Sequence, residues 1–369
     1  MANKKNQHFV PQYLFRNFST DKKSIGVLLR ESGKIIETAP IKGQCSKNNF
    51  YGSTEIENLF SEIEGEQSTI LRKILSLKSM KEFIEYYNNS DKENPEININ
   101  PDILILLQSI LFQKSRTELE ANKHREIFGN IVKEMFMREM ELQGETNIVK
   151  YKDYFTIDVD MVRTVLMMIK TSAELVDQIM DLSIYILKNK TDTKFIFSDS
   201  PVVFYNRYYK GVRLRGVLGL QIPGLMIFYP ISHDTCILLL DEGVYTGSLI
   251  GNNFFEIEND CDVTSINKLQ LHHSLNAIYF SEDMDFKYIK RLWRQQRNSL
   301  KKITPNFVTA PAMDHDGVAM GDIMHSFEPQ IPHTLNLSFL SSNILDDSSY
   351  IFRYRDPELV KEAKERLSP

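Results

Sequence analysis

The feature that most constrains the fold is a change in the spacing of apolar residues near Lys194. Before this point, from about Thr54 to Leu187, apolar side chains recur mostly every three or four residues, which is the spacing of amphipathic helices. After it, short apolar runs alternate with glycine and proline, which is typical of strands joined by turns. The sequence therefore predicts an α+β protein.

Three helices are predicted in the first part. One runs from Thr54 to Leu77, with acidic residues in its first turn that favour the helix dipole. A second runs from about Ile103 to Leu142 behind Pro101, and Gly129 is a candidate break. A third runs from Asp158 to about Leu187. Together they predict a central helical bundle.

Strands are predicted on both sides of this bundle. Residues 24–29 and 34–38 form an N-terminal β-hairpin, because Gly33 between them can adopt a positive φ. The second half is predicted to be mixed and rich in strands. Its predicted strands are 195–197, 212–220, 225–229, 236–240 and 277–280, and its predicted helices are 266–275 and 284–298.

Four parts follow from these patterns. The predicted boundaries are 1–52 for the N-terminal motif and hairpin, 53–190 for the bundle, 191–300 for the β-rich subdomain and 301–369 for an irregular C-terminal extension. The extension ends in a predicted helix over 357–367. Residues 88–100 are rich in Asn, Asp, Lys, Glu and Pro, which predicts a mobile surface loop.

Composition excludes several classes of protein. No apolar run approaches the roughly 20 residues that span a bilayer, and no apolar signal core follows the basic N-terminus, so we expect a cytoplasmic protein without a membrane partner. Cys45, Cys236 and Cys261 lie far apart without a CxxC pair, which indicates reduced thiols. The net charge of −5 gives no global basic field for nucleic acid, although local basic patches remain open.

The segment His8-Phe9-Val10-Pro11-Gln12 is the most unusual one near the N-terminus. It places an imidazole and an amide on an otherwise apolar run. His8 is a candidate general base, metal ligand or structural histidine, and Gln12 is a candidate substrate-binding residue.

Two positions of the helical part carry candidate polar groups. Gln113 and Arg116 lie one turn apart, and Arg116 could clamp a phosphate or carboxylate with two hydrogen bonds. Glu64 lies at the edge of an apolar stripe. The alternative is that Arg116 forms a buried ion pair with a glutamate of the bundle, such as Glu64 itself.

The segment Ser198-Asp199-Ser200-Pro201 ends an apolar strand, where loops commonly present catalytic groups. Asp199 is a candidate to hold a metal, to orient His8 or to cap a turn. Ser198 is a candidate substrate-binding residue, but no GxSxG elbow supports it as a nucleophile.

These segments, in this order, resemble an uncharacterised bacterial family, the domain-of-unknown-function family 4238. The resemblance covers roughly residues 6–280, and it implies no reaction. Ser200 stands where relatives often have Asn. Its carriers here are His8-x-Val10-Pro11-Gln12-x-Leu14-x3-Phe18, Asn49-Phe50-Tyr51, Ile63-Glu64, Phe112-Gln113-x2-Arg116-Thr117, Phe197-Ser198-Asp199-x-Pro201-Val202, Phe228-Tyr229-Pro230-Ile231-Ser232, Asn267 and Tyr279-Phe280-Ser281.

Other signals are weaker. His315, His325 and His333 share a segment with several aspartates but lack standard metal-ligand spacing, and His272 and His273 face different sides of a helix. The basic segment 290–297 carries the only Trp and reads as a nucleic-acid contact or as a solvated amphipathic helix. There is no P-loop, dinucleotide glycine fingerprint or HExxH.

Two functions are carried forward. The first is a hydrolase acting on a phosphodiester or nucleotide, nuclease-like and suited to a bacterial defence or toxin effector, with His8, Glu64 and Asp199 catalytic. Gln12, Gln113, Arg116 and Ser198 would then bind substrate, with a divalent metal ion as a candidate cofactor and nucleic acid or nucleotide as the partner. The second is a non-catalytic binding or sensor protein with a protein partner, in which these residues lock the fold together.

Overall fold

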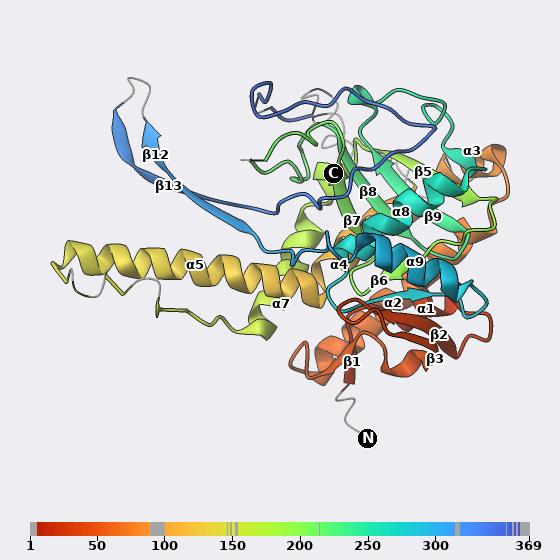
Figure 1. Cartoon of the computed structure of the whole chain (residues 1–369), viewed down its shortest axis with the longest axis horizontal. Helices are drawn as coiled ribbons and strands as arrows, with labels where there is room; N and C mark the ends of the chain where they lie inside the picture. The colour runs from red at the N-terminus through yellow and green to blue at the C-terminus, as the bar shows by residue number, and fades with distance from the viewer. Residues whose placement is uncertain are drawn as a thin grey trace.

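The computed structural model describes residues 6–88, 100–145, 147, 150–151, 154–213, 215–313, 318–351, 353–355, 358 and 361. Figure 1 shows a rounded body of sheets and helices, from which a helix and a β-hairpin project to one side. The fold is α+β, as predicted.

A five-stranded sheet forms the centre of the body, and most of its side chains are buried. Strands β10 and β5 pair in parallel, and the other neighbours pair antiparallel. Strands β8 and β9 are buried along their whole length, so apolar residues occupy both faces. The order is β10 (Phe254–Ile257), β5 (Ser183–Asn189), β9 (Thr235–Leu240), β8 (Leu225–Pro230) and β7 (Val203–Asn206).

The predicted N-terminal hairpin is present and belongs to a second, antiparallel sheet. Its strands β2 (Ser24–Leu29) and β3 (Ile35–Pro40) are followed by β11 (Ala277–Phe280) and β6 (Phe197–Ser198) in the order β3-β2-β11-β6. Because β2 pairs directly with β11, two segments that lie about 250 residues apart in the sequence meet in one sheet.

The faces of this second sheet follow the alternation of side chains along a strand. In β11, Ile278 and Phe280 pack in the cluster of Trp293, whereas Tyr279 packs against Phe15 with ring centroids 4.8 Å apart. Helix α1 (Gln12–Phe18) therefore covers one face, and α9 (Phe286–Gln296) covers the other.

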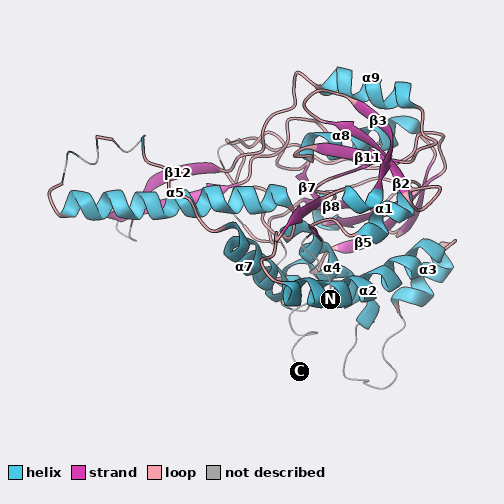
Figure 2. Ribbon diagram, turned by 90° about the horizontal axis from the view of Figure 1, so that it is seen from below, coloured by secondary structure: helices cyan, strands magenta, loops and turns pink. Residues whose placement is uncertain are grey.

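Helices form the outer layers (Figure 2). In that view α2 (Thr54–Ser76), α3 (Met80–Tyr87), α4 (Pro101–Ser115) and α7 (Met161–Glu174) lie on one side of the sheets. Helices α8 (Asp260–His273) and α9 lie on the other side. Short pieces complete the fold: β1 (Asn6–His8) paired with β4 (Ser46–Asn48), and 3-10 turns η1 (Ile41–Gly43), η3 (Val176–Ile179) and η4 (Glu242–Val244).

The prediction of one long helix over 103–142 is wrong. The segment forms α4 and then α5 (Glu118–Leu142), and the break lies at Arg116 and Thr117 rather than at Gly129. Thr117 is extended, and its hydroxyl accepts a hydrogen bond from the backbone N–H of Glu120. A new N-cap therefore starts a second helix.

The predicted helix over 158–187 is wrong in its second half. Asp160 caps α7, two residues after the predicted start at Asp158, but the helix ends at Glu174 and the chain enters β5 at Ser183. The run Ile184–Leu187 is buried between other elements on both faces. A continuous apolar run of this length does not distinguish a central strand from a buried helix.

The predicted strand over 212–220 is also wrong, because the described residues of that segment, 212–213 and 215–220, belong to no strand. Strands β7 and β10 had no prediction. The other predicted strands and the helices over 266–275 and 284–298 correspond to β6, β8, β9, β11, α8 and α9.

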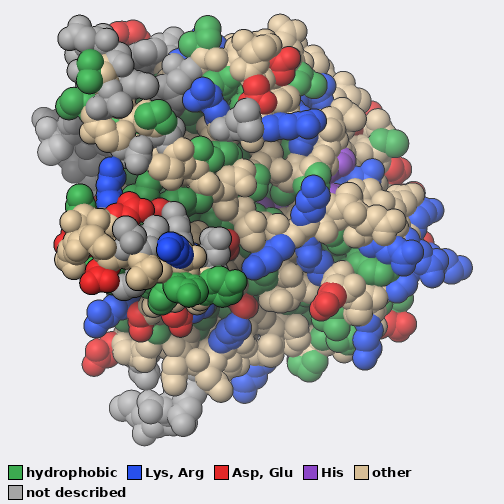
Figure 3. All heavy atoms as spheres, turned by 60° about the vertical axis from the view of Figure 1, so that its left-hand side comes forward, with side chains coloured by type: hydrophobic (Ala, Val, Ile, Leu, Met, Phe, Trp, Pro, Cys, Tyr) green, Lys and Arg blue, Asp and Glu red, His purple; other side chains and the backbone are tan. Residues whose placement is uncertain are grey.

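The projecting part is an arm made of α5 and of the hairpin β12 (Asn306–Met313) and β13 (Ala319–Phe327). In Figure 3 the arm comes toward the viewer and carries hydrophobic side chains beside charged ones. Met135 and Met320 on it are 62% and 74% exposed. The extension over 301–369 was predicted to be irregular before its terminal helix, and this hairpin shows that the prediction is wrong for the two strands.

Two predictions fall largely outside the described residues: the mobile loop over 88–100 and the terminal helix over 357–367. The division into four parts stays a prediction, and one buried apolar cluster extends from Phe9 to Leu340. Among the helices that the structure describes, none combines the length and the apolar composition needed to cross a membrane.

A glycine tests the contact between the hairpin turn and α9. Gly33 has φ +64°, and an added Cβ would lie 2.6 Å from the Trp293 ring, whereas Gly144 has φ +81° and open space around it. We expect Gly144→Ala to lower the free energy of unfolding by about 1–2 kcal/mol through backbone strain. Gly33→Ala should cost about 1–3 kcal/mol more, because the methyl group also overpacks the site. Urea denaturation of both variants checks this, and equal losses would contradict the packing argument.

Candidate functional site

Arg116 is the centre of a buried polar network. Its side chain is 1% exposed. Nε donates to the hydroxyl of Tyr51 at 3.0 Å, Nη1 to Glu64 Oε1 at 2.7 Å and Nη2 to the main-chain carbonyl of His8 at 2.5 Å. The guanidinium thus joins α4 to three other segments, and its ion pair with Glu64 is the alternative considered for it above.

Aromatic rings enclose the same guanidinium. Its central carbon lies 4.8 Å from the ring centroid of Phe112 and 5.5 Å from that of Phe60. A cation over ring faces gains electrostatic attraction that strengthens when water is excluded. Each of the three nitrogen atoms of Arg116 therefore has a partner within the chain, and the guanidinium is enclosed by rings rather than exposed to the cleft.

A cleft of about 680 Å³ lies on the outer side of this network. His8 and Gln12 line it from the N-terminal segment, and Glu64 lines it from α2. Arg16 and Lys42 add two exposed cationic side chains to its wall. The structure therefore brings His8, Gln12 and Glu64 to one open site.

The imidazole of His8 has two neighbours at Nε2. The carbonyl oxygen of Lys42 lies 3.0 Å from this atom, and the amide nitrogen of Gln12 lies 3.3 Å from it. These contacts hold the ring at the wall of the cleft. The amide oxygen of Gln12 accepts from Arg16 Nη2 at 2.9 Å, so the two residues form a fixed pair one turn apart on α1.

Asp199 lies elsewhere. Its carboxylate accepts hydrogen bonds from the backbone N–H groups of Leu275, Asn276 and Ala277 at 2.8, 2.6 and 3.2 Å, at the turn that joins α8 to β11. Burial raises the pKa of Asp199 to about 6, against the opposing effect of these three donors. Asp199 is not among the residues that line the His8 cleft, and it caps a turn, which was one of its three candidate roles.

Gln113 and Ser198 are buried and bonded to the chain. The amide of Gln113 donates to the carbonyl of Phe9 at 3.1 Å. The hydroxyl of Ser198 contacts the side chain of Gln270 at 3.0 Å and the carbonyl of Ser200 at 2.8 Å. Neither lines the His8 cleft, so neither is placed to bind a substrate there.

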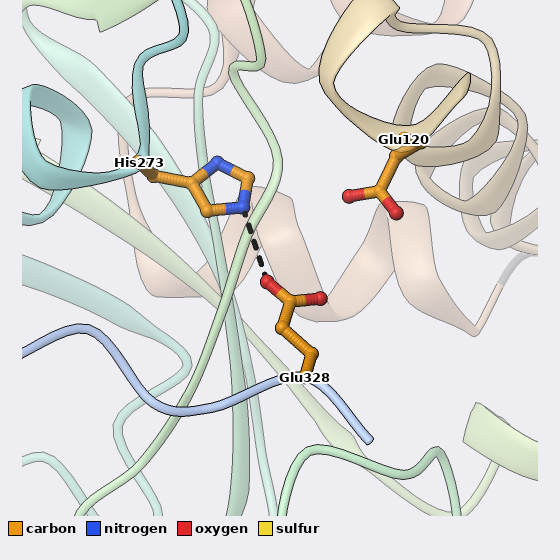
Figure 4. Close-up of side chains that lie close together, drawn as sticks. All are labelled: Glu120, His273 and Glu328. Carbon is orange, nitrogen blue, oxygen red and sulfur yellow. Dashed lines mark ion pairs between the residues drawn. The ribbon is translucent and has the colours of Figure 1, made fainter. Parts of the chain in front are cut away.

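A second group of ionisable residues lies between α4, α5, α8 and the end of β13. Glu120, His273 and Glu328 face one another in Figure 4. Lys114 Nζ and Lys123 Nζ lie 2.6 and 2.7 Å from Glu120 Oε1, and Lys123 also pairs with Glu328. We call these five residues the charged cluster.

Burial and charge oppose one another within the charged cluster. Burial alone would raise the pKa of Glu120 and Glu328, but Lys114 and Lys123 outweigh it and hold both pKa values below their usual range. Burial lowers the pKa of His273, and the nearby Lys114 lowers it further. The cluster is therefore two ammonium groups, two carboxylates and a neutral imidazole.

The profile of a family described as "Protein of unknown function (DUF4238)" matches residues 6–284, which is more than half of the chain. The chain belongs to the DUF4238 family. No curated protein and no solved structure matches it. The matched region contains the whole His8 cleft and all of the charged cluster except Glu328.

The charged cluster escaped sequence analysis. Lys114 lies within the Gln113 to Thr117 motif and Glu120 follows it, so a helical position could be predicted for both, but their burial could not. Glu328 is 205 residues from Lys123 and follows a hairpin that was not predicted. One signal was available: Thr117-x-x-Glu120 is the sequence pattern that starts a new helix.

The histidines considered as metal ligands are not brought together. His315 lies outside the described residues, His325 is on β13, and His333 stacks on His272 with ring centroids 5.9 Å apart. Within the described ranges, the group of possible ligands is Glu120, His273 and Glu328. None of these three lines the His8 cleft.

The Arg116 network makes a prediction about stability. Arg116→Ala should lower the free energy of unfolding by about 3–5 kcal/mol, because it removes three hydrogen bonds and the packing of the buried guanidinium against Phe60 and Phe112. Arg72→Ala, on the exposed side of α2, is the matched control and should cost less than about 0.5 kcal/mol. Thermal and urea unfolding check both values. Similar small losses would show that the network contributes little.

A second prediction concerns pH. Burial lowers the folded-state pKa of His272, which is 2% exposed, so the unfolded chain binds more protons below pH 6.5. Its contribution to stability is complete above pH 6.5 and is lost as the pH falls, by at most about 1.4 kcal/mol per pH unit. The difference in unfolding free energy between wild type and His272→Gln should therefore shrink from pH 7 to pH 5. A constant difference over that range would refute this prediction.

Proposed function

We propose that this chain is a hydrolase acting on a phosphodiester or nucleotide at the His8 cleft. One observation carries the proposal. The guanidinium of Arg116 binds the Glu64 carboxylate and the main chain of His8 at once, so an imidazole and a carboxylate are held in fixed positions on one open cleft. Fixed positions of this kind are what general acid–base catalysis requires.

In this proposal His8 is the general base, because its imidazole lines the open cleft together with Glu64 and an imidazole can accept a proton from an attacking water. Glu64 keeps its second carboxylate oxygen for orienting that water, while Oε1 pairs with Arg116. Arg116 is then a positioning residue that acts through Glu64 and His8. In this proposal the hydrogen bonds of Asp199, Gln113 and Ser198 stabilise the fold, and these residues do not contact the substrate.

The cationic residues on the wall support a phosphate-bearing substrate. Arg16 and Lys42 are exposed and line the same cleft, and Arg16 is oriented by Gln12. A guanidinium matches the geometry of phosphate oxygens with two parallel hydrogen bonds. Because the overall charge is negative, these local cations would select phosphate by position rather than by a long-range field. We expect this activity in the cytoplasm.

A second candidate is a non-catalytic binding or sensor protein. The observation that favours it is that the hydrogen-bond partners of Arg116 and Asp199 are other groups of this chain. In that case the same cleft would bind a phosphate-bearing ligand without turning it over. The two candidates share a ligand and differ in turnover.

The test is turnover of bis(4-nitrophenyl) phosphate and of nucleoside triphosphates by the full chain, with magnesium ions or with EDTA. His8→Gln should reduce the rate at least 100-fold, because it removes the base, and should leave the melting temperature nearly unchanged. His325→Gln, on the exposed arm, is the matched control and should retain full activity.

The outcomes separate the candidates. A rate that falls in His8→Gln but not in His325→Gln supports the hydrolase. Binding of nucleotide without turnover, lost in Arg16→Ala, supports the binding protein. A folded chain that neither binds nor hydrolyses these substrates would contradict both candidates.

A further inference from the structure

A cavity of about 440 Å³ opens beside the charged cluster, away from the His8 cleft. Lys114, Glu120, Lys123 and Glu328 stand at its wall. The remaining wall is mostly apolar. Its apolar members include Leu111, Ile127, Met168, Phe204, Leu218 and Ile222. Concave sites of this size with apolar walls and a few convergent polar groups are typical of small-molecule binding.

We propose that this cavity binds an organic carboxylate with an apolar body, and that Glu328 occupies the position of the ligand carboxylate when no ligand is bound. The proposal does not depend on the hydrolase. It assigns a separate ligand to a separate cavity.

The balance of charge supports an anion. Lys114 Nζ lies 3.2 Å from His273 Nε2, and His273 Nδ1 lies 3.0 Å from the carbonyl of Ser200. The carbonyl accepts, so Nδ1 carries the hydrogen and the imidazole is neutral. Two ammonium groups then face Glu120 and Glu328, and without Glu328 one buried positive charge would lack a partner. A buried ion of that kind requires an anion.

Glu328 is the exchangeable member of the cluster. Its side chain is 19% accessible, whereas those of Lys123 and Glu120 are 4% and 6% accessible, so solvent reaches it. It also lies outside the family-matched region, which supplies the other four residues. Glu328 follows β13 directly, in a segment that enters the cavity from the arm.

The same geometry disfavours a divalent cation, although Glu120, His273 and Glu328 have suitable atoms. Two lysine ammonium groups already lie within 2.7 Å of Glu120 Oε1. A metal ion would have to displace both of them and would add positive charge beside positive charge. A ligand carboxylate only has to replace the carboxylate of Glu328.

The experiment is calorimetric titration of the full chain with sodium octanoate, with octanol and with zinc or manganese ions. Octanoate should bind weakly to wild type and at least tenfold more tightly to Glu328→Gln, in which the internal competitor is neutral. Glu141→Gln, on the exposed end of α5, is the matched control and should bind as wild type does. Octanol should bind neither protein, because it lacks the charge.

Two further variants test the position of the ligand. Lys114→Met should abolish octanoate binding, and Met168→Trp should abolish it by filling the cavity without changing a charge. Circular dichroism establishes that each variant is folded, so an unfolded Lys114→Met leaves Met168→Trp as the deciding variant. Absence of octanoate binding to folded Glu328→Gln, equal binding by Met168→Trp, or tight binding of metal ions instead of octanoate would each overturn the proposal.

Discussion

The burial of one guanidinium is the constraint on which the N-terminal half depends. Arg116 cannot remain dry and charged without partners, and it finds them in Glu64 on α2, in Tyr51 after β4 and in the main chain of β1. Each partner belongs to a different segment. The network is complete only when these segments dock together, which couples the formation of the N-terminal segment to that of the helical layer.

Buried polar side chains that bind distant segments also occur elsewhere in the molecule. Asp199 holds the main chain at the turn before β11, and Gln113 holds the carbonyl of Phe9. The hydroxyls of Thr117 and Ser200 lie 3.3 Å apart and join α5 to the segment after β6. Polar residues on apolar segments thus form hydrogen bonds that connect distant parts of the chain. They carry the same sequence signature as catalytic residues, because both kinds are isolated polar groups in apolar surroundings.

The sequence predicted what depends on local pattern. Helix α2 begins at Thr54 as predicted, and the hairpin turns at Gly33, since both follow from nearby residues. It did not predict β5, because the run Ile184–Leu187 is buried on both faces and loses the alternation that marks a strand. At the candidate site, Arg116 and Glu64 were identified and even paired as an alternative. The contact between Lys123 and Glu328 could not be predicted, because the two residues are 205 positions apart and the contact depends on where the hairpin before Glu328 lies.

The arm has a geometric consequence. Strand β13 runs from the far end of the arm to Phe327, and the next residue contributes its carboxylate to Lys123. A strand advances about 3.4 Å per residue, so a shift of β13 along its axis by one residue would move Glu328 by more than the length of an ion pair. The register of the hairpin therefore determines whether Glu328 reaches Lys123.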